Sequence, residues 1–399
     1  MTCPLIPNGT ARRLFLDRHA LAEPPAGPSR GDALCQLVDR LGFVQVDSIN
    51  TVARAHDMIL YSRRNSYRSK HLQPPLETDR RMFEHWTHDA SVIPVQFFPH
   101  WQLRFARDRD KLRARWREDR RAGFEEKADE ILAQIGDHGA VCSADVGTDE
   151  KRSSGGWWDW HPSKTALEYL WRSGALSVTR RAGFRKYYDL TERVIPAEFA
   201  NVRPDLAETV EWACSAALDR LGFATSGEVA AFWDLVTSAE ARDWCARALA
   251  SGRVIEVDIE PADGGKPRRS FAWPDLPDLP VPELSPRIRI LSPFDPALRD
   301  RKRAERLFGF AYRIEVFVPE PKRTYGYYVF PVIEADRLIG RIDMKSSRET
   351  GVLSVRGFWP EAGVKMGKGR LDRLVAEIER VARFADSRNI QFAPDWLRG

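Results

Sequence analysis

The chain has 399 residues, of which 43% are hydrophobic and 30% are charged, and this composition excludes a disordered protein. That length allows about two to four domains, each with a core of its own. The 62 Lys and Arg residues against 57 Asp and Glu residues leave a net charge of +5, which permits a polyanionic partner without requiring one.

The first hundred residues predict two helices and a strand. Residues 11–21 are expected to be helical, and the proline-rich segment 24–28 ends that helix. A second helix follows, and Gly42 ends it; its apolar residues at helical spacing are Leu34, Leu37, Val38 and Leu41. Residues 44–50 then alternate as a strand does. This is the outline of a helix-turn-helix unit with a wing.

The same outline recurs twice. Helices are expected at 124–135 and 162–173, with a turn at 139–146 that opens another helix, and a hairpin follows over 174–190. The third copy covers 206–257 and closes with a wing strand. Three loose repeats of this kind predict tandem winged helices.

The composition changes at the proline-rich segment 274–286, which we interpret as a linker. Aromatic and β-branched runs beyond it predict strands at 287–291, 312–318, 325–333, 337–345 and 352–359, and a final helix is expected at 368–386. The predicted fold is therefore α+β, with tandem winged helices followed by a C-terminal β-rich domain. The expected domains are 1–118, 119–200, 201–275 and 276–399.

Gln45 and Asp47 are the first candidate site. In a strand they project from one face while Val44 and Val46 fill the other, so an amide and a carboxylate lie side by side and could hold one water molecule. The alternative is that Asp47 caps a helix starting near Ser48, which is a common use of Asp.

Several segments, in order, resemble one family. They are Gln45–Asn50 with Ala53–His56, Phe83–Ser91, Gly156–Trp160, and Leu291–Pro296 with Glu305–Phe310. Over nearly the whole chain they resemble the winged-helix DNA glycosylases of the AlkZ and YcaQ kind. The Gln-x-Asp of this chain is similar to the YcaQ branch, whereas the other branch has Gln-x-Gln. The family more often has Glu where Asp89 stands.

The resemblance implies a monofunctional DNA glycosylase that removes alkylated purines, unhooks interstrand crosslinks and leaves abasic sites. Gln45 and Asp47 would be catalytic, with no cofactor. An N7-alkylated purine already carries positive charge and leaves as a neutral molecule, so one carboxylate that orients water suffices. We expect Ser48, His56, Trp86 and His88 to line the lesion cleft. His85 and His88 lie three apart on an expected helix, but no third metal ligand follows them.

Basic residues suggest where duplex DNA binds, because a guanidinium matches phosphate oxygens. The expected contacts are Arg54, Arg63, Arg64, Lys164, Arg180, Arg181, Arg185 and Lys186. Phe184 at the basic hairpin tip is either a wedge against the duplex or a residue tucked under its own hairpin. The arginine-rich helix from Trp101 onward is either a DNA contact or a salt-bridged surface helix. Trp157, Trp158 and Trp160 are expected to pack rather than to stack on bases.

The five cysteines are scattered, so neither a disulfide framework nor a zinc site of usual spacing is expected. The start of the chain lacks the apolar core of a signal peptide, and we expect a cytoplasmic, nucleoid-associated monomer that does not bind membranes. Two rival functions are a non-catalytic winged-helix regulator that binds DNA and a hydrolase of another glycosidic bond.

Overall fold

The computed structural model describes residues 3–118, 123–147, 150 and 161–398, and the fold forms two compact units. Unit 1 comprises Met1–Ser69, Ala217–Val229 and Cys245–Gly399. Unit 2 comprises Lys70–Ala216 and Ala230–Trp244. Three helices contribute residues to both: α10 (Leu206–Leu221), α11 (Ser226–Trp233) and α12 (Ser238–Ala250).

Unit 1 begins with the expected helices. They are α1 (Asn8–Arg18), α2 (Gly31–Leu41) and, after β2 (Val44–Gln45), α3 (Ala55–Tyr61). The four apolar residues predicted to share one face of α2 are all buried. Gly42 then ends the helix with φ of +87°, a conformation that costs glycine little. The expected strand over 44–50 is much shorter, since only Val44 and Gln45 are extended in a ladder.

A four-stranded sheet of unit 1 has the order β1-β9-β10-β8. Its strands are β1 (Leu5–Ile6), β8 (Phe223–Ala224), β9 (Ile255–Ile259) and β10 (Arg268–Ala272). β9 and β10 form an antiparallel hairpin in the register Ile255↔Ala272, and β1 pairs with β9 in parallel. This confirms the wing strand expected after the third helical copy.

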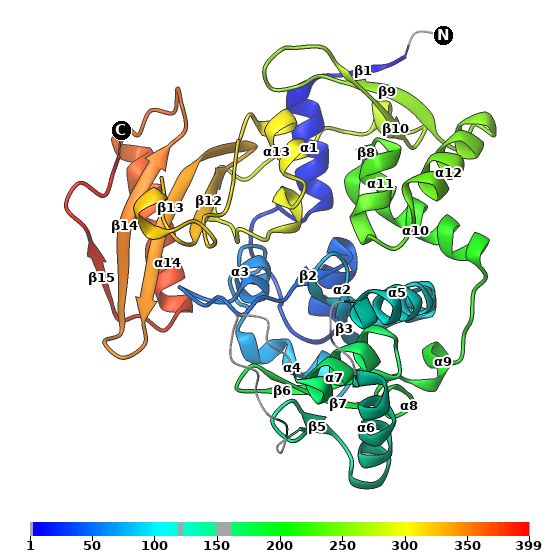
Figure 1. Ribbon diagram of the computed structural model, residues 1–399. Helices are drawn as coiled ribbons and strands as arrows, with labels where there is room; N and C mark the ends of the chain where they lie inside the picture. Colours follow the sequence, from blue (N-terminus) through cyan, green and yellow to red (C-terminus); the bar gives the residue numbers. More distant parts are fainter. Residues whose placement is uncertain (1–2, 119–122, 148–149, 151–160, 399) are drawn as a thin grey trace. The chain divides into compact units, whose positions relative to one another are not determined.

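The C-terminal part of unit 1 is a five-stranded sheet in the order β11-β12-β13-β14-β15 (Figure 1). Its strands are β11 (Ile288–Ile290), β12 (Val329–Glu334), β13 (Arg337–Ser347), β14 (Val352–Pro360) and β15 (Asn389–Phe392). Helix α14 (Lys368–Phe384) packs against it with Leu374, Ile378 and Val381 buried. Helix α13 (Arg301–Phe308) lies between β11 and β12 in the chain. The strand predicted over 312–318 is wrong, because that segment is a loop.

Unit 2 contains a winged helix with its own apolar core. Helices α6 (Phe124–His138) and α7 (Pro162–Arg172) pack with a sheet of order β5-β7-β6, formed by β5 (Val141–Cys142), β6 (Leu176–Ala182) and β7 (Arg185–Leu190). Phe124, Ile131, Ile135 and Trp171 are buried in that core. The predicted helices at 124–135 and 162–173 and the predicted hairpin are thereby confirmed.

The rest of unit 2 is an antiparallel hairpin and further helices. β3 (Met82–Trp86) pairs with β4 (Ala90–Pro94) in the register Trp86↔Ala90. The helices are α4 (Gln73–Glu77), α5 (Phe98–Glu118), α8 (Thr191–Val194) and α9 (Ala197–Ala200).

One local expectation in unit 2 is wrong: His85 lies in strand β3 and His88 in the turn after it, so the two histidines do not share a helix. Of the segment 139–146, Ser143–Val146 form the expected turn, and the helix expected to follow it lies largely outside the described residues. The predicted packing tryptophans Trp157, Trp158 and Trp160 lie outside the described residues. Among the residues that are described, no helix has the length and apolarity needed to cross a bilayer.

Candidate functional site

Asp47 lies two residues beyond the end of β2, in a turn that it holds itself. Its Oδ1 atom accepts a hydrogen bond from the backbone N–H of Ile49 at 2.7 Å. Val44, Gln45 and Val46 are all buried, so burial does not alternate along this segment, and Asp47 is the first of these residues that is partly exposed. The strand therefore anchors the segment by its valines and leaves the carboxylate half-buried at the end.

The helix-cap alternative for Asp47 does not hold. After β2 the next helix, α3, begins only at Ala55, and the residue before it is Arg54. The bond from Ile49 is a side-chain turn of the kind that Asp makes with a backbone N–H two residues on. It uses one carboxylate oxygen and leaves Oδ2 without a hydrogen bond from the described residues.

Burial raises the pKa of Asp47, and the hydrogen bond from Ile49 lowers it by less. Within the described part of the chain, no Lys or Arg forms an ion pair with this carboxylate. A charged group kept away from water without a cation is a stronger base than an exposed aspartate.

Tyr328 is a neighbour of Asp47 that the sequence did not suggest. Its side chain is fully buried immediately before β12, and its ring lies 6.0 Å from the ring of Phe294. Burial raises the pKa of Tyr328, and the negative charge of Asp47 raises it further. The phenol therefore stays neutral beside the carboxylate. No periodicity connects residues so far apart in the chain, so no sequence signal could have found this pair.

The other expected site residues of unit 1 surround this segment in the chain. Gln45 is 2% exposed, so its amide is positioned by packing rather than by solvent. Ser48 is exposed, and His56 places Nε2 3.7 Å from Oδ2 of Asp57. Asp57 in turn accepts a hydrogen bond from the hydroxyl of Tyr67 at 2.9 Å. Arg54, expected to contact DNA, is half-buried immediately before α3.

The prediction that Arg63 contacts DNA is wrong, because its side chain is 0% exposed. Its Nη1 and Nη2 atoms donate to the carboxylate of Asp295 at 2.5 and 2.9 Å, and its Nε atom donates to the carbonyl of His19. Arg64 is more accessible but pairs with Glu23 at 2.9 Å. Arg63 is therefore an interior residue of unit 1, whereas Arg64 belongs to a partly exposed ion pair.

In unit 2, strand β3 carries a carboxylate that organises the hairpin β6–β7. Glu84 is buried, and its two oxygens accept hydrogen bonds from Nη2 and Nε of Arg181 at 2.6 and 2.7 Å. Arg181 also donates to the carbonyl of Phe184, and its guanidinium lies 4.3 Å from the Phe184 ring. Arg181 is thus a structural residue of the hairpin, and Phe184 folds back onto it, as the second interpretation of that residue expected.

The two remaining arginines of the hairpin, Arg180 and Arg185, are exposed. Arg180 stacks over the ring of Tyr187 at 3.7 Å, which leaves its edge facing solvent. Lys186 differs from them, since its Nζ lies 3.3 Å from the ring centre of Trp171 and 4.0 Å from Glu84. Burial lowers the pKa of Lys186. Two of the four cations predicted at this tip, Arg180 and Arg185, are therefore exposed to solvent, and the other two have partners within the fold.

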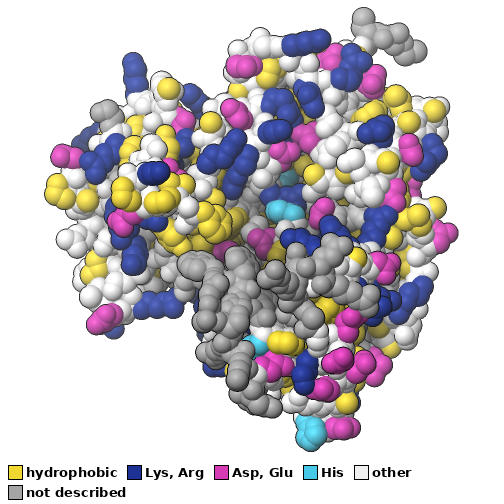
Figure 2. Space-filling view, viewed as in Figure 1, with side chains coloured by type: hydrophobic (Ala, Val, Ile, Leu, Met, Phe, Trp, Pro, Cys, Tyr) yellow, Lys and Arg dark blue, Asp and Glu magenta, His cyan; other side chains and the backbone are white. Residues whose placement is uncertain are grey.

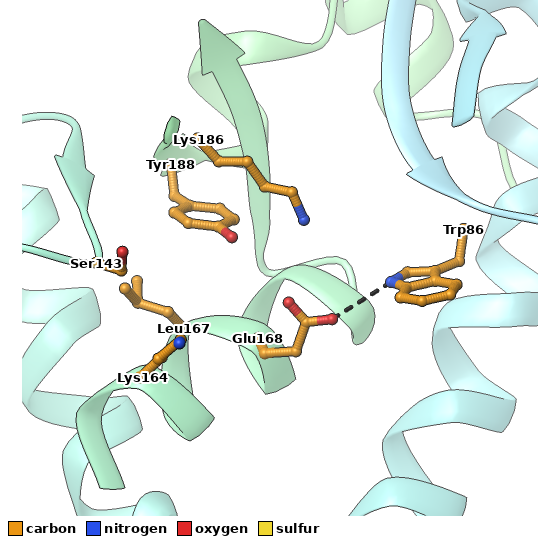
Figure 3. Close-up of a pocket in the computed structure, with 7 residues that line it drawn as sticks. All are labelled: Trp86, Ser143, Lys164, Leu167, Glu168, Lys186 and Tyr188. Atoms are coloured by element: carbon orange, nitrogen blue, oxygen red, sulfur yellow. Dashed lines mark hydrogen bonds between the residues drawn. The ribbon is translucent and has the colours of Figure 1, made fainter. Parts of the chain in front are cut away.

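Three expected site residues line one pocket of about 320 Å³ in unit 2 (Figure 3). Trp86 comes from β3, Lys164 from α7 and Lys186 from β7. The indole N–H of Trp86 donates to Glu168 of α7 at 3.3 Å, and the Arg172 guanidinium covers the same indole at 4.6 Å. Trp86 is thus fixed in a polar network. His88 is exposed in the turn after β3, while His85 is buried with Nε2 3.0 Å from the Trp171 carbonyl.

The arginines of α5 form ion pairs and hydrogen bonds within unit 2. Arg104 is buried and donates to the Trp233 carbonyl, Arg107 pairs with Glu240 at 2.5 Å, and Arg113 pairs with Glu125 at 3.0 Å. The salt-bridged alternative therefore describes these three residues. In the residues that the structure covers, no group of three His, Cys, Asp or Glu side chains is arranged to hold a metal ion.

A family model described as AlkZ-like DNA glycosylase matches residues 38–384. The chain belongs to the AlkZ-like DNA glycosylase family. Among solved structures, the DNA glycosylase AlkZ of Streptomyces sahachiroi is similar, with 17% sequence identity and a TM-score of 0.65 over 98% of this chain and 99% of that chain. At that identity the likeness concerns the fold.

This DNA glycosylase is accordingly an enzyme that hydrolyses N-glycosyl bonds in DNA, and a non-catalytic regulator no longer describes it. The α+β fold with tandem winged helices and a C-terminal β-rich domain is confirmed. The four domain boundaries, the residue roles and the monomeric state stay predictions.

Proposed function

We propose that this DNA glycosylase releases N7-alkylated purines, including those that form interstrand crosslinks, with Asp47 as the base and Gln45 as its partner. The observation that carries the proposal is the state of Asp47: half-buried, fixed by Ile49, and without an ion pair in the described residues. Such a carboxylate is oriented and basic at once, which is what activation of a water molecule requires.

The chemistry needs only this one acidic group. An N7-alkylated guanine carries a positive charge, so the C1′–N9 bond breaks with its electrons moving to the base, which leaves neutral. The sugar develops oxocarbenium character, which a nearby carboxylate stabilises. Asp47 takes one proton from the attacking water, and the hydroxyl adds to C1′. The buried amide of Gln45 would hold the same water from the other side.

Crosslinked purines fit this arrangement because the positive charge on the base drives cleavage of the glycosidic bond. The base does not first have to be rotated out of the duplex. A base tethered to the opposite strand resists full rotation into a closed pocket. Asp47 lies in a turn next to exposed Ser48, where the sugar could approach without being enclosed. The geometry of this turn therefore supports attack on a lesion that stays near the duplex.

The test uses a duplex with one central N7-methylguanine and a second duplex with a nitrogen-mustard crosslink. Heating in alkali converts the abasic site left by each released base into a strand break, and unhooking separates the crosslinked strands on a denaturing gel. We expect Asp47→Asn to lower single-turnover base release by about 10²- to 10⁴-fold, the usual value of a general base. Gln45→Ala should lower it less.

The matched control is Asp372→Asn, which removes the same charge from an exposed position on α14. It should release bases at the wild-type rate. Binding of each variant to a duplex with a stable abasic-site analogue separates chemistry from affinity. Undiminished base release by Asp47→Asn would overturn the role of Asp47, and release of methylguanine without unhooking would limit the substrate to single adducts.

A further inference from the structure

Phe317 is 88% exposed, and the other large hydrophobic side chains described as exposed range from 37% to 56%. The residue stands in a turn of the loop that connects α13 to β12. A phenyl ring held in water forgoes the stabilisation that burial would bring. Large apolar groups exposed in this way commonly mark a binding site.

The turn that carries Phe317 is braced by one carboxylate. Glu315 accepts hydrogen bonds from the backbone N–H groups of Thr324, Tyr325 and Gly326 at 2.9, 2.8 and 2.9 Å. The N–H of Val318 donates to the carbonyl of Glu315 at 2.9 Å. Burial acts to raise the pKa of Glu315, but these backbone bonds outweigh it and the pKa is lowered. The apolar tip is therefore presented by a preorganised loop.

A second brace closes the other side of the turn. The Nε atom of Arg323 donates to the carbonyl of Val318 at 2.8 Å, directly after the exposed ring. The same guanidinium lies 5.1 Å from the ring of Tyr327, which is itself 37% exposed. Hydrogen bonds on both sides therefore hold the backbone of the turn that carries Phe317.

The loop begins and ends at buried tyrosines. At its start, the hydroxyl of Tyr312 donates to the carbonyl of Val329 at 2.5 Å. At its end stands Tyr328, whose pKa is raised by burial and, to a smaller extent, by the charge of Asp47. The exposed phenyl ring and the carboxylate of Asp47 belong to the same unit.

The exposed charges of the loop leave a small positive excess, which favours a polyanion over a cation. Arg313 and Lys322 are exposed in the loop together with the one carboxylate of Glu320, and Arg356 on β14 is exposed 3.8 Å from Asp343. The carboxylate of Glu315 is occupied by the loop backbone and offers little repulsion. Figure 2 shows hydrophobic side chains interspersed with Lys and Arg, and with some Asp and Glu, on the visible face of the C-terminal domain.

We propose that Phe317 is a wedge that enters between neighbouring base pairs of the DNA substrate while Arg313 and Lys322 contact flanking phosphates. Apolar side chains inserted at a base step unstack it and kink the duplex, and base–aromatic stacking is independent of sequence. Unstacking beside the lesion would open the sugar to attack from Asp47. The benefit of the wedge for catalysis rests on the proposed role of Asp47. Insertion of Phe317 into DNA does not depend on that role.

The test uses the full chain in the Asp47→Asn background, so that the substrate stays intact. A duplex carries 2-aminopurine next to N7-methylguanine, and 2-aminopurine brightens when its stacking is lost. We expect Asp47→Asn to raise the fluorescence and the added Phe317→Ala to abolish that rise, with Kd weakened about tenfold. Phe317→Trp should restore both readings, since indole also stacks.

The matched control is Val281→Ala, an exposed apolar side chain of the proline-rich segment. It should leave fluorescence and Kd unchanged, and thermal melting should show that Phe317→Ala is folded. Equal fluorescence and equal Kd with and without Phe317 would overturn the wedge, as would a complete failure of Asp47→Asn to unstack the duplex. A normal fluorescence rise with no base release by the wild type would instead overturn the proposed lesion chemistry alone.

Discussion

Arg63 and Asp295 form a two-pronged ion pair in the interior of unit 1, with neither side chain accessible to solvent. Arg63 follows α3, and Asp295 caps the short helical turn Pro296–Leu298 by accepting from the N–H of Ala297 at 3.0 Å. The pair thus joins the start of the chain to the entrance of the C-terminal domain. Each charge is tolerated in the interior only because the other is present.

Arg63→Met is expected to lower the free energy of unfolding by about 3–5 kcal/mol, because it leaves the carboxylate of Asp295 buried without a partner. Its neighbour provides the control. Arg64→Met breaks a partly exposed pair with Glu23 and should cost less than about 1 kcal/mol. Urea unfolding of both variants measures the difference. Similar losses for the two substitutions would contradict the special role of the buried pair.

Substitutions in the hairpin β6–β7 should distinguish cations that contact DNA from cations that stabilise the fold. The double variant Arg180→Ala and Arg185→Ala removes two exposed charges, so the slope of log K against log salt concentration should fall by about 1.8. Arg181→Ala should lower Tm strongly, because Glu84 loses its bidentate partner. Fluorescence anisotropy at several salt concentrations gives the slopes. An unchanged slope in the double variant would rule out the hairpin as a phosphate contact.

The rate of base release should fall at acid pH and should not fall as the pH rises above neutral. Asp47 must be ionised to accept a proton, and burial raises its pKa above the ordinary value of 3.8. Activity should therefore fall as the pH drops toward that raised pKa. The leaving base needs no proton, so no enzyme group has to stay protonated at higher pH. Single-turnover rates from about pH 4 to pH 8 test this, and a bell-shaped profile would reveal a proton donor instead.

Asp47→Asn should melt at a higher temperature than the wild type at neutral pH. Because the folded-state pKa is raised, ionisation above pH 3.8 opposes folding, and this penalty is fully present at pH 7 and absent below the ordinary pKa. The amide keeps the oxygen that accepts from Ile49 but carries no charge. We expect a rise in Tm on the order of 1 °C for a chain of this size. A lower Tm at pH 7 would mean that the carboxylate stabilises the fold.

Glu228 should make the stability of unit 1 depend on acid pH in the opposite sense. Burial acts to raise the pKa of Glu228, but the charges of Arg303 and Arg306 lower it from 4.5 to about 2. Its contribution is therefore present above pH 4.5 and lost as the pH falls toward 2. Glu228→Gln should cost about 3 kcal/mol at pH 7 and progressively less below pH 4.5.

Unfolding in urea at pH 7 and pH 4 measures the effect of Glu228→Gln. Glu256→Gln is the control, because its bond to Arg269 is exposed and should contribute little at either pH. An equal loss for Glu228→Gln at both pH values would show that packing, rather than charge, accounts for it.

The sequence predicts the long amphipathic helices and most strands correctly because those elements follow local periodicity, whereas the helix expected around His85 is a strand. Local periodicity does not predict the ion pairs, because the partner of Arg63 lies 232 positions away in the chain and the partner of Glu84 lies 97 positions away. Sequence alone does not distinguish an arginine in the interior from one that faces DNA, so the DNA contact predicted for Arg63 is wrong and the buried partner of Arg181 is missed. The segment 312–318 has the composition of a strand, yet Glu315 binds the loop backbone and prevents it from joining the sheet.

The buried pairs also suggest how a genetic screen would sort inactive alleles. A cell that produces this protein with a substitution at Arg63 or Glu84 should lose repair at high growth temperature and regain it at low temperature, because the substitution impairs folding. A change at Asp47 should be null at every temperature. Temperature sensitivity would then distinguish residues that stabilise the fold from residues that act in catalysis, without purification of the variants.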